Sequence, residues 1–330
     1  MEKLEHIIVR LGGVNLLPVA VAAIAFVLIG TPSSWVTLTV AGLAMGMMIF
    51  LMASGLSLVF GLMSVLNFGH SAFVSFGAFV AASVLAGLSG WLSGDSIFLG
   101  AMALFLAVTA ALLFGLIAGW FFETVIIRPV YEDHLRQILI TMGALIVSEQ
   151  IILAVWGGTP TAVPRPGFLE GALILGDVSI EIYRIFAFGL GLVVYIALYL
   201  VLNRTRIGLL VRAGVESREM VEALGFRIDR LFIGVFMLGS ALAAMGGAMW
   251  AGYETLISPA LGGEIMIIVF IVVIIGGLGS IEGTLLGAIM VGLVGNYVGF
   301  LAPKLALASN MILMMAILMW RPSGLRPAVK

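Results

Sequence analysis

The chain alternates between long apolar runs and short polar segments. A helix of about 20 apolar residues spans the hydrocarbon core of a bilayer, so each run is a candidate membrane crossing. Glycines interrupt the run 35–60, which leaves open a broken or re-entrant segment there. The runs predict an all-α, polytopic transmembrane helical bundle of about eight to ten spans, forming one domain over residues 1–330. The candidate spans are 14–30, 35–60, 66–88, 96–122, 136–156, 184–202, 229–252, 264–280, 283–300 and 305–320.

The basic residues predict the orientation of this bundle. With the N-terminus inside, thirteen of the sixteen Lys and Arg residues lie in cytoplasmic segments. Only Arg165, Arg184 and Lys304 then lie outside. Because Lys and Arg are enriched in cytoplasmic loops, both termini are expected in the cytoplasm. Glu2 and Glu5 argue against a cleaved signal peptide, so the first helix is expected to be retained.

Composition narrows the class of protein further. Hydrophobic residues make up 62% of the chain and charged residues 10%, which is typical of a protein with lipid as its solvent. Charge is clustered between the apolar runs, which indicates membrane loops. We therefore expect the protein to contact membrane lipid and no nucleic acid. The chain has no Cys and three scattered His, so no metal site is expected.

Small residues recur at a spacing of four in the run 229–252. Such stripes let another helix approach closely in a membrane, so they favour tight helix packing. Helices that slide or bend during transport are the alternative interpretation. The stripes consist of Gly239, Ala243, Gly247 and Ala251, and of Ser240, Ala244, Ala248 and Gly252.

Polar residues within or beside the apolar runs are candidates for a translocation pathway. Glu149 is the one acid recognised inside a run, where an ionised carboxylate needs a partner, water or a proton. The alternative, given equal weight, is a carboxylate that reaches the outer membrane interface or is hydrogen-bonded within the bundle. At the start of the third run, Asn67, Phe68, Gly69, His70 and Ser71 place polar groups within about one helical turn. Irregular polar backbone at this depth is tolerated mainly where protein buries it or where it lines a watery cavity.

Two loops carry organised sequence. In the cytoplasmic loop 203–228, Ser217 is a candidate N-cap and Gly225 a candidate stop for a short helix. Met220, Val221 and Leu224 supply an apolar stripe for a partner's groove; a solvated loop is the alternative. In the external loop 157–183, the Gly176-Asp177 pair predicts a small hairpin.

The sequence contains no motif for an energy-converting or catalytic site. No glycine-rich turn is followed by Lys, so there is no P-loop. HExxH, GxSxG and paired-carboxylate patterns are also missing, so no enzyme is expected. We therefore expect no cofactor in this chain, and it cannot itself drive transport by hydrolysing ATP.

Several motifs together resemble the H-type permease of branched-chain amino acid ABC importers. Residues 61–79 (GLMSVLNFGHSAFVSFGAF) resemble its signature. Further matches are Glu123 with Arg128-Pro129-Val130, Thr141 with Gly143, residues 205–214 (TRIGLLVRAG) with Ala223-Leu-Gly225, 276–283 (GGLGSIEG) and 320–325 (WRPSGL). Where the family often has Ala-His-Gly, this chain has Gly69-His70-Ser71. The resemblance covers nearly the whole chain in order.

The resemblance implies a multi-pass permease subunit in the bacterial inner membrane. Its implied partners are a related M-type permease subunit or a second copy, two cytoplasmic ATP-binding subunits and a periplasmic substrate-binding protein. Branched-chain amino acids or related small amides and carboxylates are the implied substrates. The implied ATPase-coupling residues are Glu216, Ser217, Glu219, Met220, Ala223, Leu224 and Gly225. An ion-coupled secondary transporter using Glu149, or a passive small-solute channel, is the alternative.

Overall fold

Ten apolar helices build the part of the chain that the computed structural model describes, namely residues 14–63, 65, 67–92, 96–131, 133–216, 218–223, 225 and 227–327. Seven of them are long and apolar enough to cross a membrane, and α2, α12 and α14 are shorter. Each coincides with one predicted run, which confirms the polytopic helical bundle. The helices are α2 (Leu17–Ile29), α3 (Pro32–Met63), α4 (His70–Gly87), α6 (Ile97–Phe121), α7 (His134–Trp156), α8 (Ile182–Arg204), α11 (Ile228–Glu254), α12 (Leu261–Gly276), α13 (Ile281–Leu301) and α14 (Ala306–Trp320).

Short elements join these helices. They are α5 (Ser89–Leu92), a π-helical turn (Phe122–Ile127), 3₁₀ turns (Arg128–Val130, Gly167–Leu169, Pro303–Leu305), α9 (Arg206–Glu216), α10 (Arg218–Ala223) and four strands, β1 (Thr161–Ala162), β2 (Ala172–Leu175), β3 (Val178–Glu181) and β4 (Leu256–Ile257). β2 and β3 pair antiparallel, with Leu175 opposite Val178, so the predicted hairpin around Gly176-Asp177 is confirmed. β1 pairs antiparallel with β4, which joins the loop after α7 to the loop after α11.

The glycine-interrupted run 35–60 is one continuous helix, so the broken or re-entrant alternative is wrong. Its glycines are contact points for neighbouring backbones instead. A Cβ on Gly46 would lie 2.8 Å from the carbonyl oxygen of Ala288 in α13. A Cβ on Gly55 would lie 2.1 Å from that of Gly239 in α11. Glycine therefore serves α3 by letting two helices approach its backbone, as membrane helices permit.

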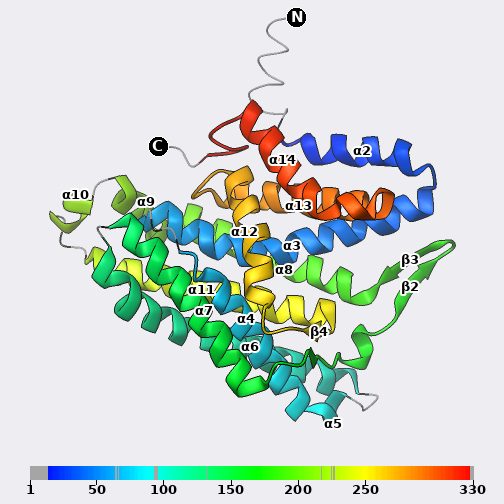
Figure 1. The fold of residues 1–330 in the computed structure, drawn as a ribbon. Coiled ribbons are helices and arrows are strands. Elements are labelled where there is room, and N and C mark those ends of the chain that lie inside the picture. The colour runs from blue at the N-terminus through cyan, green and yellow to red at the C-terminus, as the bar shows by residue number, and fades with distance from the viewer. Residues whose placement is uncertain are drawn as a thin grey trace, which may run out of the picture.

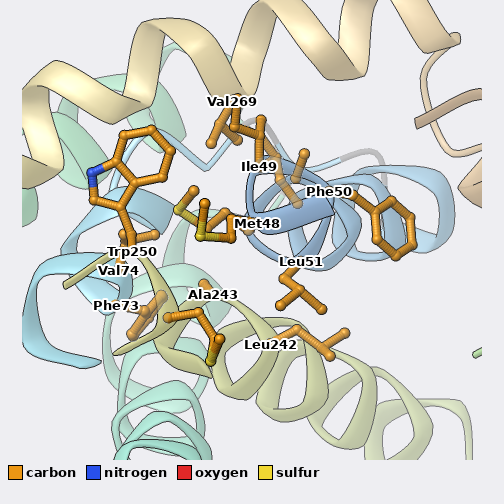
Figure 2. Close-up of a cluster of buried hydrophobic side chains, with 14 of the residues drawn as sticks. Met48, Ile49, Phe50, Leu51, Phe73, Val74, Leu242, Ala243, Trp250 and Val269 are labelled. Atoms are coloured by element: carbon orange, nitrogen blue, oxygen red, sulfur yellow. The ribbon is translucent and has the colours of Figure 1, made fainter. Parts of the chain in front are cut away.

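The core lies where α3, α4 and α11 meet, with α12 packed against them (Figure 1). In α3, every residue from 46 to 59 is buried, so this helix is surrounded by protein along half its length. Figure 2 shows Met48 and Leu51 of α3 beside Phe73 of α4 and Leu242 of α11. The small-residue stripes of α11 lie in this core, which confirms tight packing as their role.

The two organised loops lie at opposite ends of the bundle. Figure 1 shows α9 and α10 at one end and the β2–β3 hairpin at the other. The chain turns sharply from α8 into α9. The turn brings Gly208 so close to α8 that a Cβ on it would lie 2.0 Å from the carbonyl oxygen of Leu202. The helix α9 was not predicted; residues 206–216 were read as part of a loop. That these loops face opposite sides of the membrane stays a prediction.

Candidate functional site

The junction between α3 and α4 lies inside the bundle. Asn67 is fully buried, and Gly69 directly precedes the first turn of α4. The backbone N–H of Phe68 donates to Oγ1 of Thr141 in α7 at 3.2 Å. The ring of Phe68 stacks on that of Phe270 in α12, with centroids 4.8 Å apart. The structure thus places the predicted group of residues 67–71 between α3, α7 and α12.

Gly69 has no room for a side chain. A Cβ there would lie 2.5 Å from Cζ of Phe122 and 3.1 Å from the carbonyl oxygen of Thr141. The Phe122 ring is held in turn by Phe73 of α4 and Phe236 of α11, at centroid distances of 5.2 and 6.0 Å. This aromatic group walls the junction on the side of α6.

His70 ties the start of α4 to the middle of α3. Its ring is buried, and Nε2 lies 2.9 Å from the carbonyl oxygen of Met52. A carbonyl only accepts, so Nε2 carries the hydrogen and donates it. In the neutral ring, Nδ1 is then an acceptor without a partner among the described residues. This geometry fits a histidine that positions α4.

Several buried polar atoms at the junction have no hydrogen-bond partner among the described residues. They are Oδ1 and Nδ2 of Asn67, Nδ1 of His70, and the hydroxyls of Ser57, Ser71 and Ser75. Leaving such a group unpaired costs about 1–3 kcal/mol, so each exception calls for an explanation. Their concentration around the start of α4 makes this region the candidate functional site.

The first turn of α12 closes the junction against Ser71 and Ser75. A Cβ on Gly262 would lie 2.6 Å from Oγ of Ser75 and 2.9 Å from the carbonyl oxygen of Ser71. The next residue, Gly263, faces Glu149 of α7, whose Oε1 lies 3.1 Å from the position of a Cβ on Gly263. Glu149 is half-buried, and it contacts the opposite side of the same turn of α12 from Ser71 and Ser75. It is a neighbour of the junction rather than part of it.

A second acid at depth, Glu123, was missed as a candidate by the hydropathy pattern. Its side chain is 4% exposed, and Oε2 accepts a hydrogen bond from Oγ1 of Thr124 at 3.3 Å. Nearby, Arg128 pairs with Asp229 of α11 at 3.4 Å. The predicted run ended at residue 122, whereas a π-helical turn extends the helix to Ile127. The sequence signal that could have identified Glu123 was its motif with Arg128-Pro129. The observed π-helical turn adds to this signal, because such turns frequently occur at functional sites.

The segment predicted to be a cytoplasmic contact forms a short helix, α10, but its predicted apolar stripe is divided. Met220 is 66% exposed and Ala223 is exposed, so both are available to a partner. Val221 is only 3% exposed and packs into the protein, so its predicted place in a partner's groove is wrong. Burial of Val221 fastens α10 to the bundle.

The stop of this helix matches its prediction. Gly225 has φ +85°, a conformation that favours glycine, and its N–H donates to the carbonyl oxygen of Glu222 at 2.9 Å. Glu216 ends α9 and Glu219 lies within α10. Ser217 and Leu224 lie outside the described residues, so the predicted cap at Ser217 stays a prediction.

Comparison with known protein families decides the class of the protein. The family described as "Branched-chain amino acid transport system / permease component" matches residues 38–320. The chain belongs to this family. The match extends from α3 to the end of α14 and includes both the junction and the segment α9–α10. The chain is accordingly a multi-pass integral membrane permease, and its relatives support a bacterial inner-membrane location.

Individual relatives of this permease are distant but collinear with it. It is 28% identical to the high-affinity branched-chain amino acid transport system permease protein BraD of Pseudomonas aeruginosa, over 88% of this chain and 95% of the relative. It is 25% identical to LivH of Escherichia coli over the same shares. A probable LivH of Methanocaldococcus jannaschii is 24% identical over 74% of this chain and 75% of the relative. No solved structure matches the chain.

Proposed function

We propose that this chain is the membrane subunit of a binding-protein-dependent ABC importer that carries branched-chain amino acids or closely related small carboxylates. The family and the names of the relatives, which are branched-chain amino acid transport permeases, support this assignment. The structural observation that supports it most directly is the group of buried polar atoms around the start of α4 that have no hydrogen-bond partner among the described residues.

These atoms have the chemistry that a zwitterion with an apolar side chain needs. Oδ1 of Asn67 can accept hydrogen bonds from an ammonium group, while Nδ2 of Asn67 and the Ser71 hydroxyl can donate to a carboxylate. The start of α4 adds the partial positive charge of a helix N-terminus, which favours an anionic group. The stacked rings of Phe68 and Phe270 offer an apolar surface beside them.

The junction is closed in this structure, since Asn67, His70 and Ser71 are all at most 2% exposed. We propose that it opens during the transport cycle by separation of α4 from α12. The contact of Gly262 with Ser71 and Ser75 marks where these helices part. Glu149 lies on the far side of that contact and acts as a neighbouring polar group, not as a coupling acid.

The proposed partners follow from the same assignment. Two ATP-binding subunits supply the energy and contact α10 through Met220 and Ala223. The other predicted coupling residues, Glu216, Ser217, Glu219, Leu224 and Gly225, belong to the same proposed contact. A substrate-binding protein delivers the amino acid to the opposite end, and a related permease or a second copy completes the pore. ATP is bound by the ATPase subunits, and this chain needs no cofactor and catalyses no reaction itself.

The test is to purify the tagged chain from its own membranes in mild detergent and to identify the proteins that accompany it. The recovered complex is then reconstituted, and uptake of labelled leucine is measured with and without ATP on the ATPase side. Recovery of ATPase subunits with ATP-dependent uptake is expected. Uptake by the chain alone, without ATP and abolished by Glu149→Gln, would instead establish an ion-coupled carrier.

A further inference from the structure

A groove of about 560 Å³ runs along the outside of the bundle between α4, α6 and α7. Phe73 and Phe76 of α4 form its floor, and residues of α6 and α7 form its two walls. Among the lining side chains, the only polar one is Ser148, and its hydroxyl donates to the carbonyl oxygen of Ala144 at 2.7 Å. The groove therefore presents carbon alone to whatever fills it.

The groove is open at the periphery of the protein. Phe121 on the α6 side is 52% exposed, and Val147 on the α7 side is 57% exposed. Both helices are among those long and apolar enough to cross the membrane. At this depth the surrounding solvent is hydrocarbon, so an apolar occupant is required. Its volume is that of a site for one small ligand, about 300–1,000 Å³.

A basic residue lies at one end of the groove. On α7, Ile140, Gly143, Val147 and Ile151 line the groove and follow one another at spacings of three or four residues. Residues at this spacing share one helix face, and Arg136 stands one turn before Ile140 on that face. The Arg136 side chain is 75% exposed, and among the described residues it pairs with Asp133 alone, as an exposed ion pair at 3.0 Å. Such a pair contributes little, so the guanidinium remains available to a phosphate.

We propose that this groove binds one acyl chain of an anionic phospholipid whose phosphate is held by Arg136. The apolar lining takes the chain, and the guanidinium at the membrane surface takes the headgroup. Basic residues between membrane helices on the cytoplasmic side recognise anionic headgroups, and the positive-inside pattern places residue 136 on that side. The lipid lies against Phe73, and thus against the back of the junction at Gly69 and Phe122.

The lining offers a position where the groove can be filled without disturbing the fold. A Cβ on Gly143 would meet nothing within 4 Å, so Gly143→Leu places its side chain in the groove. Gly189 in α8 is the matched control, because a Cβ there also meets nothing within 4 Å and the residue lies outside the groove. Arg136→Gln removes the headgroup contact and leaves the lining intact.

The experiment is native mass spectrometry of the full chain titrated with phosphatidylglycerol and, separately, with phosphatidylcholine of the same acyl chains. Gly143→Leu is expected to weaken binding of both lipids by about tenfold or more, because it displaces buried methylenes. Arg136→Gln is expected to weaken the binding of phosphatidylglycerol by about fivefold while leaving the binding of phosphatidylcholine unchanged. Gly189→Leu should bind both lipids as the unchanged chain does.

Two results would overturn the proposal. One is equal lipid binding by Gly143→Leu and Gly189→Leu, which would leave the groove without a role in binding. The other comes from a photoreactive phenylalanine analogue placed at Gly143 in the intact complex. Crosslinking of this analogue to phospholipid supports the proposal, whereas crosslinking to a second permease chain would make the groove a subunit interface.

Discussion

A Cβ atom on Gly247 of α11 would lie 2.0 Å from the carbonyl oxygen of Val74 in α4, so these two helices are in backbone contact. The same pair of helices meets again where a Cβ on Gly77 would lie 2.1 Å from the carbonyl oxygen of Ala244. Without a hydrophobic driving force between helices in lipid, such close packing is a main source of association. The position of α4, and of the polar junction at its start, therefore depends on these glycines.

Gly247→Ala is expected to lower the free energy of unfolding by roughly 1–3 kcal/mol, because the added methyl group forces α4 away from α11. The measurement is the thermal unfolding midpoint of the purified chain in detergent. Gly189→Ala is the control, since its Cβ meets nothing within 4 Å. Equal midpoints for the two variants would contradict the close helix contact.

Asn67→Leu is expected to keep or raise stability while reducing leucine uptake by at least about tenfold. Burial of an unpaired amide costs about 1–3 kcal/mol, and leucine removes that cost together with the groups proposed to receive substrate. Thermal midpoint and ATP-dependent uptake are measured on the same preparation.

The matched control for this prediction is Asn296→Leu in α13. Nδ2 of Asn296 donates to the carbonyl oxygen of Gly292 at 2.9 Å, so this substitution should lower stability and spare uptake. Unchanged uptake in Asn67→Leu would remove Asn67 from the pathway. A clear loss of stability in Asn67→Leu would mean that its amide is paired in the native membrane.

Arg165→Gln is expected to release the loop 157–181 from the end of α11. The Arg165 guanidinium donates to the carbonyl oxygens of Gly252 and Tyr253, and it lies 4.9 Å from the centre of the Tyr183 ring. A hydrogen bond to a charged group contributes about 1.5–3 kcal/mol, so cleavage of residues 157–181 by an added protease should accelerate several-fold.

Arg184→Gln provides the comparison. Arg184 pairs with the part-exposed Glu181 three residues away at 3.1 Å, and its guanidinium lies 5.6 Å from the centre of the Tyr253 ring, but among the described residues it makes no hydrogen bond to the backbone of α11. Its loss should change the cleavage rate little. Equal protease sensitivity of the two variants would show that Arg165 does not fasten the loop.

Ala223→Asp is expected to abolish uptake without lowering the thermal midpoint, because Ala223 is exposed on the segment proposed to meet the ATPase subunits. ATP hydrolysis by the reconstituted complex should no longer respond to substrate. Val221→Asp is the contrasting variant: it buries a charge at a position 3% exposed, so the thermal midpoint should fall strongly. Normal uptake by Ala223→Asp would place the ATPase contact elsewhere.

The sequence by itself determined which segments are the long apolar helices, although it did not predict the polar helix α9. Lipid cannot hydrogen-bond a backbone, so every crossing must be an apolar helix of sufficient length, and this constraint is readable from composition alone. The ten predicted runs correspond to ten helices for this reason. The hairpin at Gly176-Asp177 was also predictable, because a two-residue turn has its own local chemistry.

Only the tertiary structure decided what each residue within those helices meets. Glycines look like breaks along α3 until neighbouring backbones are in place, and Val221 looks like a partner-binding residue until α10 is packed. Asn67 and His70 are recognisable in the sequence as polar residues. Their burial, and the lack of hydrogen-bond partners for several of their atoms, result from packing around the junction by segments distant in the chain, including Met52, Thr141 and Gly262. Local pattern sets secondary structure and marked residues 67–71 as candidates, whereas burial and pairing depend on segments far apart in sequence, so what surrounds the site was known only once the helices had packed together.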